Sequence, residues 1–361
     1  MIKTSLSKVY TPIIDELLSR FKEYVQNGQF IGGSYSDEFE TKVAKFLGTT
    51  ACVGCRSGSH AIVLALKAAG VGPDDEVISV ANTYYATIWA IKEVGAKPVF
   101  CDISPNNALV DLDQIEKLIS PRTKAILPVH LYGIPCDLDR LQSICRRHQI
   151  QLIEDASHAF GSKYKNRFVG SDSDYACFSL YPTKNLGAFG NSGIVVTKNK
   201  NNAETVRNLL CFSKDPLNGT FVEDAIHVQM DSLQAALVSV VLNHFEQYAN
   251  RRKQIAKTYA ECINGHVQYL PQLIYDEIVP YVFCIYADNR EKLITYLKSK
   301  GIIAQVHYRN DLHHFEQFAS NPISLPNTEW HNQHVLSLPV SPDLSNDEVY
   351  YICETLLNYY K

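Results

Sequence analysis

The order of segments between residues 51 and 155 is the feature that most constrains the fold. Short apolar runs typical of buried strands alternate there with segments whose apolar residues recur at helical spacing. Consecutive parallel strands need a crossover connection, which is usually a helix. The alternation therefore predicts an α/β fold in which helices cover both faces of a buried, parallel sheet. The expected strands are 51–54, 76–81, 98–102, 124–131 and 151–155, and the expected helices are 60–69, 84–94, 112–119 and 138–148.

The segments outside this region differ in character. Two N-terminal helices are expected, over 12–27 with an apolar face and from a cap at Ser36 to Gly48. The later part of the chain contains a long helical stretch from residue 231 to about 259 and fewer strands. This change predicts a large α/β domain over 1–250 and a smaller α+β domain over 251–361. The smaller domain is expected to contain a strand at 281–286, a helix at 290–300, a strand at 303–307 and a closing helix at 346–359.

The composition excludes several classes of protein. The 361 residues are 46% hydrophobic and 20% charged, as in a soluble globular protein. The net charge of −4 provides no basic field for nucleic acid. No apolar run approaches the roughly 18–20 residues that span a membrane. The N-terminus lacks the apolar block of a signal peptide and the ten cysteines are scattered, so we expect a cytoplasmic protein with reduced thiols.

One lysine lies between an expected strand and a Gly-rich loop. Lys184 follows the apolar run at 178–180, and Pro182 and the glycines after it prevent a helix. A lysine held on a fixed turn beside apolar walls can lose its proton and attack a carbonyl. The plainer interpretation is an ordinary loop lysine. Asp155 favours the functional interpretation, because it ends the expected strand upstream, and an acid and a lysine at strand ends are paired in pyridoxal phosphate (PLP) enzymes.

Two motifs carry a resemblance to a known family. The segment 154–161, Glu-Asp-Ala-Ser-His-Ala-Phe-Gly, and the segment 178–188, which contains Tyr-Pro-Thr-Lys-Asn-Leu-Gly, are similar to the EDAxxxxG and FSFYPTKNLGA segments of the DegT/DnrJ/StrS nucleotide-sugar aminotransferases. The resemblance extends from about Phe30 to the C-terminus. It implies a fold-type-I PLP-dependent transferase with a mostly parallel seven-stranded sheet.

The resemblance also implies roles for particular residues. Lys184 would form the Schiff base with PLP, and Asp155 would keep the pyridine nitrogen protonated. Gly58, Ser59 and Ser179 match residues that hold the cofactor phosphate, which suits the N-terminus of a helix. Tyr84 matches the aromatic ring that stacks on the pyridine, and His158 matches a residue near the phenolic oxygen.

Each of these residues also has a structural interpretation. Ser57 with Gly58 could form a helix cap, and Asp155 could cap the next helix. Tyr84 could pack in the core at a helix start, and His158 could be a satisfied structural histidine. His307 and Tyr308 match a family pair near the mouth of the active site and are weaker candidates on the substrate side.

The implied reaction has two halves and two substrates. L-glutamate would donate its amino group to the cofactor, which would pass the group to a keto carbon of a nucleotide-linked hexose. The sequence around Lys184 resembles family members that act on 3-keto sugars, so we expect a dTDP-3-keto-6-deoxyhexose. A 4-keto sugar linked to dTDP or UDP is the alternative. The family also implies a homodimer with shared active sites.

Three departures from the family pattern affect this expectation. The family's Arg-Asn-(His/Tyr)-Gly stretch is Leu-Cys-Phe-Ser at 210–213. His227 replaces an asparagine that contacts the cofactor phosphate of the neighbouring subunit. Arg309 replaces a proline near the substrate rim. A catalytically decayed relative with a binding or regulatory role therefore remains an alternative.

Other candidate sites are not favoured. A dinucleotide-binding oxidoreductase would need a glycine fingerprint after the first strand, and residues 54–58 do not contain one. Cys52 and Cys55 have no second CxxC pair to complete a metal site. His313 and His314 lack an acidic partner at metal-ligand spacing. We therefore expect no metal site.

Overall fold

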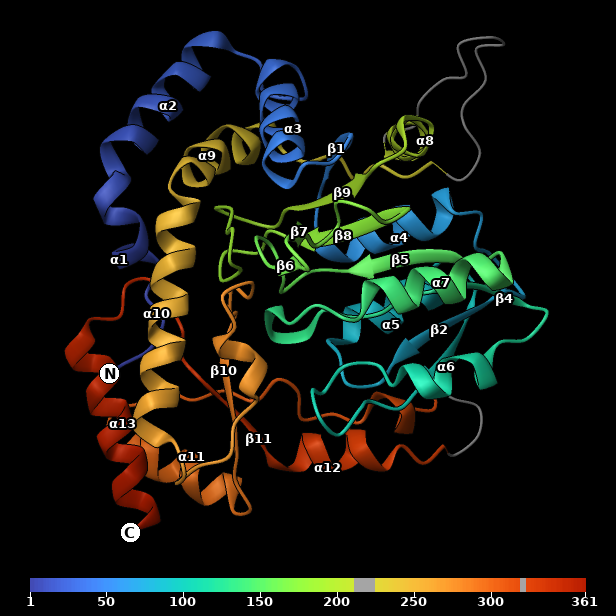
Figure 1. The fold of residues 1–361 in the computed structure, drawn as a ribbon. Coiled ribbons are helices and arrows are strands. Elements are labelled where there is room, and N and C mark those ends of the chain that lie inside the picture. The colour runs from blue at the N-terminus through green and yellow to red at the C-terminus, as the bar shows by residue number, and fades with distance from the viewer. Residues whose placement is uncertain (211–224, 319–322) are drawn as a thin grey trace, which may run out of the picture.

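A seven-stranded sheet forms the centre of the computed structural model, which describes residues 1–210, 225–318 and 323–361 (Figure 1). The strand order is β1-β9-β8-β5-β4-β2-β3. Neighbours from β8 to β3 are parallel, whereas β9 runs antiparallel to both β1 and β8. The expected α/β fold with a mostly parallel sheet is confirmed. The strands are β1 (Ala51–Cys55), β2 (Glu76–Val80), β3 (Lys97–Cys101), β4 (Thr123–Ile126), β5 (Gln151–Asp155), β8 (Tyr175–Ser179) and β9 (Gly193–Thr197).

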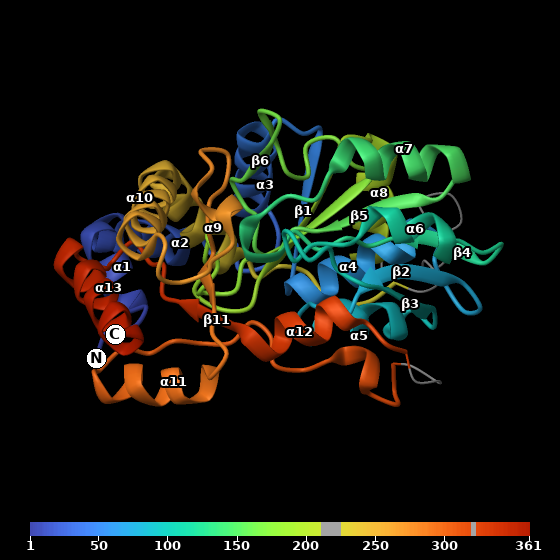
Figure 2. The ribbon, with the colours of Figure 1, turned by 60° about the horizontal axis from the view of Figure 1, so that its bottom comes forward.

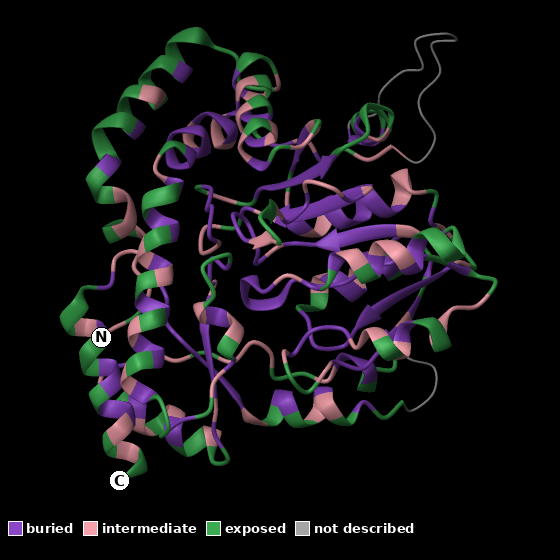
Figure 3. Ribbon diagram, in the orientation of Figure 1, coloured by how far each residue is buried: buried purple, intermediate pink, exposed green. Residues whose placement is uncertain are grey.

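Both faces of this sheet are buried. Successive side chains of a strand point to opposite faces, and Leu152 and Ile153 of β5 accordingly belong to two different core clusters. Helices α6 and α7 pack on the face of Leu152, and α4 and α5 pack on the other. The strands are correspondingly buried over most of their length (Figure 3). These helices are α4 (Gly58–Ala68), α5 (Tyr85–Glu93), α6 (Leu112–Leu118) and α7 (Leu138–His148).

The C-terminal part lies beside the sheet (Figure 2). Its two strands, β10 and β11, pair with each other and not with the large sheet. The expected boundary at residue 250 falls inside the continuous helix α10, and the division into two domains stays a prediction. The elements are α10 (Phe245–Ile263), β10 (Phe283–Tyr286), α11 (Arg290–Ser299), α12 (Pro326–His334), β11 (Val335–Leu338) and α13 (Asn346–Tyr360).

The remaining helices lie around β1 and α10, and a short hairpin precedes β8. They are α1 (Leu6–Tyr10), α2 (Ile14–Asn27), α3 (Ser34–Leu47), α8 (Lys200–Leu210) and α9 (Ser232–Asn243), and the hairpin strands are β6 (Lys163–Tyr164) and β7 (Arg167–Phe168). Within the described residues, four short 3-10 turns connect elements: η1 (Thr11–Ile13), η2 (Leu131–Gly133), η3 (Pro271–Ile274) and η4 (Leu312–His314).

Three local expectations were wrong. The helical stretch from residue 231 is interrupted at His244, which separates α9 from α10. Residues 303–307 do not form a strand, because only Gln305 bridges to β11 before the segment turns away. Helix α3 begins at Ser34, after a glycine with a positive φ angle at Gly33, so Ser36 lies within the helix.

The apolar face of α2 is only partly covered. Leu17 packs into the core, but Leu18, Phe21 and Val25 are 57%, 44% and 50% exposed. These three residues recur at helical spacing and form a continuous apolar stripe on the outer side of the helix. The stripe has no covering element within the part of the chain that is described. No helix in the described residues is long and apolar enough to cross a membrane.

A buried carboxylate attaches α12 to the large sheet. Asp102 follows β3, and its Oδ1 accepts hydrogen bonds from the Thr328 backbone N–H at 2.9 Å and from the Thr328 hydroxyl at 2.8 Å. Its Oδ2 accepts the backbone N–H of Asn327 at 3.0 Å. These donors belong to the first turn of α12, where a negative charge is favourable. The position of α12 is therefore fixed relative to the strand ends.

Candidate active site

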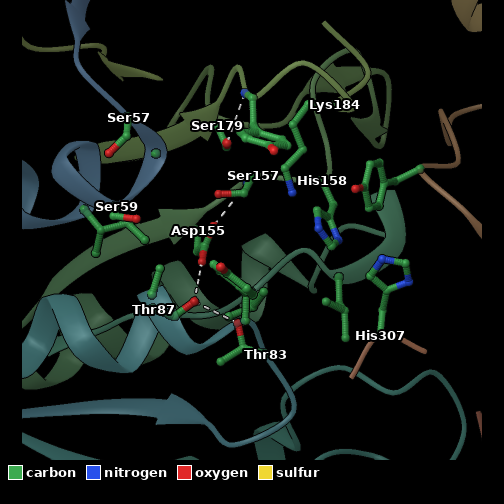
Figure 4. A pocket seen from close by; sticks show the side chains of 18 of the residues that line it. Ser57, Ser59, Thr83, Thr87, Asp155, Ser157, His158, Ser179, Lys184 and His307 are labelled. Atoms are coloured by element: carbon green, nitrogen blue, oxygen red, sulfur yellow. Dashed lines mark hydrogen bonds between the residues drawn. The ribbon is translucent and has the colours of Figure 1, made fainter. Parts of the chain in front are cut away.

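A cavity of about 410 Å³ opens at the carboxyl ends of the parallel strands. Ligand sites of α/β sheets form at this edge. Most of the lining comes from loops that follow β1, β2, β5 and β8, and Tyr281, His307 and Tyr308 of the C-terminal part complete it. Figure 4 shows serines on one side of the cavity and Lys184, His158 and His307 on the other.

The serine side is built around the N-terminus of α4. Ser57 is the N-cap, and its side chain accepts the backbone N–H of His60 at 3.2 Å. Gly58 packs against Ser179, where an added Cβ would lie 2.7 Å from the Cβ of that serine. Ser59 completes this wall of the cavity. A helix N-terminus surrounded by hydroxyl groups is suited to bind a phosphate.

Asp155 is the buried acid of the cavity and is only 4% exposed. Its Oδ2 accepts the hydroxyl of Thr87 at 2.7 Å, and its Oδ1 accepts the backbone N–H of Ser157 at 3.1 Å. Thr83 lies 2.8 Å from Thr87 and extends the chain of hydroxyls (Figure 4). Each oxygen of Asp155 is therefore held by a donor, and the carboxyl group lines the cavity.

The loop that carries Lys184 is fixed by several contacts. The Lys184 backbone N–H bonds to the carbonyl of Tyr181 at 2.8 Å. The next residue, Asn185, is buried and donates its side-chain amide to the Val279 carbonyl at 2.9 Å. At Gly187 an added Cβ would lie 2.3 Å from the Pro182 carbonyl oxygen, so only glycine fits. The lysine side chain therefore starts from a rigid turn and points into the cavity (Figure 4).

The environment of Lys184 lowers the pKa of its amine from 10.5 to about 8. Dehydration of the ammonium group is the larger cause, and the negative charge of Asp155 partly opposes it. The Nζ atom lies 4.6 Å from the centre of the Tyr281 ring. An amine with a pKa of about 8 has a substantial unprotonated fraction near neutral pH, as a nucleophile and base requires.

His158 has a defined tautomer. The backbone N–H of Tyr132 donates to its Nδ1 at 3.3 Å, so the proton is on Nε2. Nε2 lies 3.2 Å from the hydroxyl oxygen of Tyr308 and donates to it. The ring stacks on Tyr281 with 4.1 Å between centroids. Burial and the nearby Lys184 hold the pKa of His158 well below its usual value, so the imidazole is neutral. Tyr308 is left with its own hydroxyl hydrogen to donate into the cavity.

The structure brings together every residue that the sequence singled out for the cofactor. Their individual roles remain predictions. The cavity lining includes all of Gly58, Ser59, Tyr84, Asp155, His158, Ser179 and Lys184, and also His307 and Tyr308.

Other candidates lie elsewhere. Arg309 is half-exposed and pairs with Glu291 at 2.6 Å, and His227 is exposed and outside the cavity lining. Of the altered stretch at 210–213, residues 211–213 lie outside the described residues. Cys52 and Cys55 are buried free thiols on β1.

Sequence reasoning missed several lining residues. Thr87 follows Tyr84 closely in the sequence, yet its bond to Asp155 depends on the rotation of α5 about its axis. Tyr281 comes from the C-terminal part, and no sequence pattern connects it with Lys184. Thr87 contacts Asp155, and Tyr281 contacts Lys184.

The residues of the cavity fit PLP. A phosphate suits the α4 N-terminus, a ring nitrogen suits the buried Asp155, and an aldehyde suits the amine of Lys184. Gly58 leaves the approach to Ser179 free of a Cβ. The cavity therefore offers groups suited to the phosphate, the ring nitrogen and the aldehyde of this cofactor.

Comparisons with known proteins agree with this chemistry. The profile of the DegT/DnrJ/EryC1/StrS aminotransferase family matches residues 12–357. A pleiotropic regulatory protein of Geobacillus stearothermophilus is 35% identical, over 99% of this chain and 97% of its own. A dTDP-3-amino-3,4,6-trideoxy-alpha-D-glucose transaminase of Micromonospora megalomicea subsp. nigra is also 35% identical, over 92% of this chain and 91% of its own.

Solved structures with a closely similar fold agree with the match to this family. The crystal structure of DesV from S. venezuelae in complex with a ketimine intermediate superposes with a TM-score of 0.94. It is 32% identical and covers 99% of this chain and 97% of the DesV chain. Other structural neighbours were solved with pyridoxamine phosphate or PLP.

The lowered pKa of Lys184 predicts a pH-dependent stability of the PLP-free protein. Because folding lowers this pKa from 10.5 to about 8, the unfolded chain binds more protons between these values. The stability of the wild type should therefore rise with pH through that window, and the cost of burying the ammonium should be fully present below it. Lys184→Met removes this cost and should stabilise the PLP-free protein more at about pH 7 than at about pH 10.

Urea unfolding of both proteins at the two pH values measures this difference. An equal change in the free energy of unfolding at both would show that the pKa of Lys184 is not lowered in the folded state.

Proposed function

Because the chain belongs to the DegT/DnrJ/EryC1/StrS aminotransferase family, whose members depend on PLP, we propose that it transfers an amino group from L-glutamate to a nucleotide-linked keto-hexose. The product would be an amino sugar for deoxyamino-sugar biosynthesis. The observation that carries this proposal is the placement of Lys184, with its lowered pKa, and the buried Asp155 in one cavity at the strand ends.

The large sheet supplies the residues that would hold the cofactor. Ser59 and Ser179, with the N-terminus of α4, would bind the phosphate. Asp155 would bind the ring nitrogen, and Tyr84 would cover the ring. Bound PLP supplies an electron sink that stabilises negative charge on the carbon next to the reacting amine.

Lys184 moves the protons of the reaction. With a pKa of about 8, its free amine can remove the proton from the Cα atom of L-glutamate. In the second half-reaction its ammonium form can deliver a proton to the sugar carbon that carried the keto oxygen. Tyr281 beneath the Nζ atom limits the positions that this side chain can adopt.

The C-terminal part supplies the wall for the sugar. Tyr281, His307 and Tyr308 line the cavity opposite the serines. The pKa of His307 falls to about 4 because of burial and the nearby Lys184, so this imidazole is also neutral. Neutral groups that donate and accept hydrogen bonds suit the hydroxyl groups of a hexose.

We place the keto group at carbon 3 of a dTDP-linked 6-deoxyhexose. The support is the sequence Tyr-Pro-Thr-Lys-Asn-Leu-Gly at 181–187 and the similarity to a transaminase of a dTDP-3-amino sugar. A 4-keto sugar linked to dTDP or UDP is the alternative substrate. A regulatory role without catalysis is a second candidate function, because one relative bears the name of a pleiotropic regulatory protein.

We also propose that the enzyme is a homodimer with shared active sites. The uncovered stripe of Leu18, Phe21 and Val25 on α2 suits a second copy of the chain, and Tyr84 at the cavity is 60% exposed.

Sedimentation analysis should show a dimer for the wild type and for the control Lys22→Ala. Phe21→Asp should weaken the association of the two subunits and increase the fraction of monomer. A monomeric wild type would overturn this proposal and leave the chemistry intact.

Two substitutions test the catalytic assignment. Lys184→Ala should fold but lose both turnover and the covalent link to PLP that borohydride makes permanent. Asp155→Asn should retain PLP yet lose transamination by orders of magnitude, because a neutral amide cannot hold the proton of the ring nitrogen. The absorbance spectrum, borohydride labelling and turnover measure these effects.

Lys165→Ala is the matched control, since Lys165 is an exposed lysine that pairs with Asp139. Wild-type rates in Lys184→Ala would contradict the central assignment. Near-normal rates in Asp155→Asn would give Asp155 a structural role. A wild type that binds PLP but aminates no keto-sugar would favour the regulatory function.

The position of the keto group can be tested separately. A misplacement of about 1 Å at the reacting centre can lower the rate roughly 100-fold. We therefore expect a higher kcat/KM for a dTDP-3-keto-6-deoxyhexose than for its 4-keto isomer. Side-by-side values that favour the 4-keto isomer would reject this substrate and leave the PLP chemistry untouched.

A further inference from the structure

Three potential metal ligands that do not line the cavity converge near the start of α12. His313 and His314 belong to η4, and Glu329 belongs to α12. One ligand atom from each of the three lies within 4.8 Å of the others. No acidic partner of the histidine pair is visible in the sequence, because Glu329 reaches the pair only through the position of α12 in the fold.

The separations match those of a metal site. The Nε2 atoms of His313 and His314 lie 3.2 Å and 3.6 Å from the same oxygen, Oε1 of Glu329. Ligands at about 2.0–2.1 Å from a tetrahedral zinc ion lie about 3.3–3.4 Å apart. Two imidazoles and one carboxylate are also an established ligand set for zinc, with a water at the fourth position.

The three side chains are held in place by the surrounding structure. The two imidazole rings lie 4.1 Å apart, although adjacent residues usually point in different directions. The Leu325 backbone N–H donates to Oε1 of Glu329 at 3.1 Å and orients the carboxylate. Asn332 of α12 bonds to Asp311, beside η4, at 2.8 Å. Little rearrangement is therefore needed to bind an ion.

The cluster also has a route from solvent and an imidazole free to change tautomer. His313 is buried, whereas the His314 side chain is 52% exposed. The Nδ1 atom of His313 is buried and has no hydrogen-bond partner among the described residues. Because no bond to Nδ1 fixes the tautomer, Nε2 can present its lone pair to a metal.

We propose that His313, His314 and Glu329 bind a divalent transition-metal ion, with zinc as the best match. The ion would join η4 to α12 and fix the segment that follows η4. In that segment Phe318 contacts Tyr85 with 5.1 Å between ring centroids, and Tyr85 is the neighbour of Tyr84 at the cavity. Because none of its three ligands lines the cavity, the ion would take no part in the transfer of the amino group.

This proposal is tested by measuring zinc binding to the PLP form of the protein. The protein is purified without a histidine tag and treated with a chelator beforehand. Isothermal titration should give one high-affinity zinc per chain, and cobalt should give the absorption bands of a tetrahedral site. Zinc should raise the melting temperature and slow amide exchange in residues 312–318.

His314→Ala should weaken zinc binding at least about 10-fold, and this variant keeps the bond between His313 and Glu329. Glu329→Gln should do the same. His266→Ala, which removes another exposed histidine, should bind as the wild type does. The proposal fails if the wild type binds no stoichiometric zinc, or if His314→Ala binds it equally well.

Discussion

The site depends on a carboxylate that is buried next to a buried amine. Removing Asp155 from water is costly unless its oxygens are hydrogen-bonded. One bond comes from Thr87 on α5 and the other from the backbone after β5. These bonds supply a donor to each oxygen of the carboxylate. Its charge only partly offsets the dehydration of Lys184, whose pKa stays near 8. The site therefore combines a hydrogen-bonded carboxylate with an amine of lowered pKa in one cavity.

The position of each site residue in the fold explains which parts of the site the sequence predicted. In a parallel sheet all the strand ends meet at one edge, so Ser57, Asp155 and Lys184 had to come together once the alternation of strands and helices was recognised. The contacts of Thr87 and Tyr281 were not predictable in the same way. They depend on the rotation of a helix and on the packing of the C-terminal part, which leave no periodic signal.

The segment 303–307 illustrates the limit of pattern reasoning. Its apolar residues suit a strand, and Gln305 exchanges two backbone hydrogen bonds with Ser337 of β11. Pairing ends there because the carbonyl of His307 accepts the hydroxyl of Tyr132, beside the large sheet. A tertiary hydrogen bond thus replaces the next bond of the ladder and directs His307 and Tyr308 into the cavity.

The hydroxyl of Tyr132 belongs to a chain of hydrogen bonds whose directions are all determined. Because this hydroxyl donates to His307, its oxygen must accept Nε2–H of His331 at 2.8 Å. Nδ1 of His331 then accepts the hydroxyl of Tyr286 at 3.1 Å. Burial lowers the pKa of His331 to about 3, so the ring stays neutral and the directions do not reverse at physiological pH.

The wall formed by His307 and Tyr308 has supports of its own. These two residues are held through Tyr132, His331 and the attachment of α12 to Asp102, whereas Asp155 and the serines rest on the large sheet. Lys184 and His158 lie between the two sides, because Tyr281 contacts both of their side chains. A substitution near His331 can therefore move His307 and Tyr308 without displacing Asp155, which allows one cofactor chemistry to be combined with different acceptors.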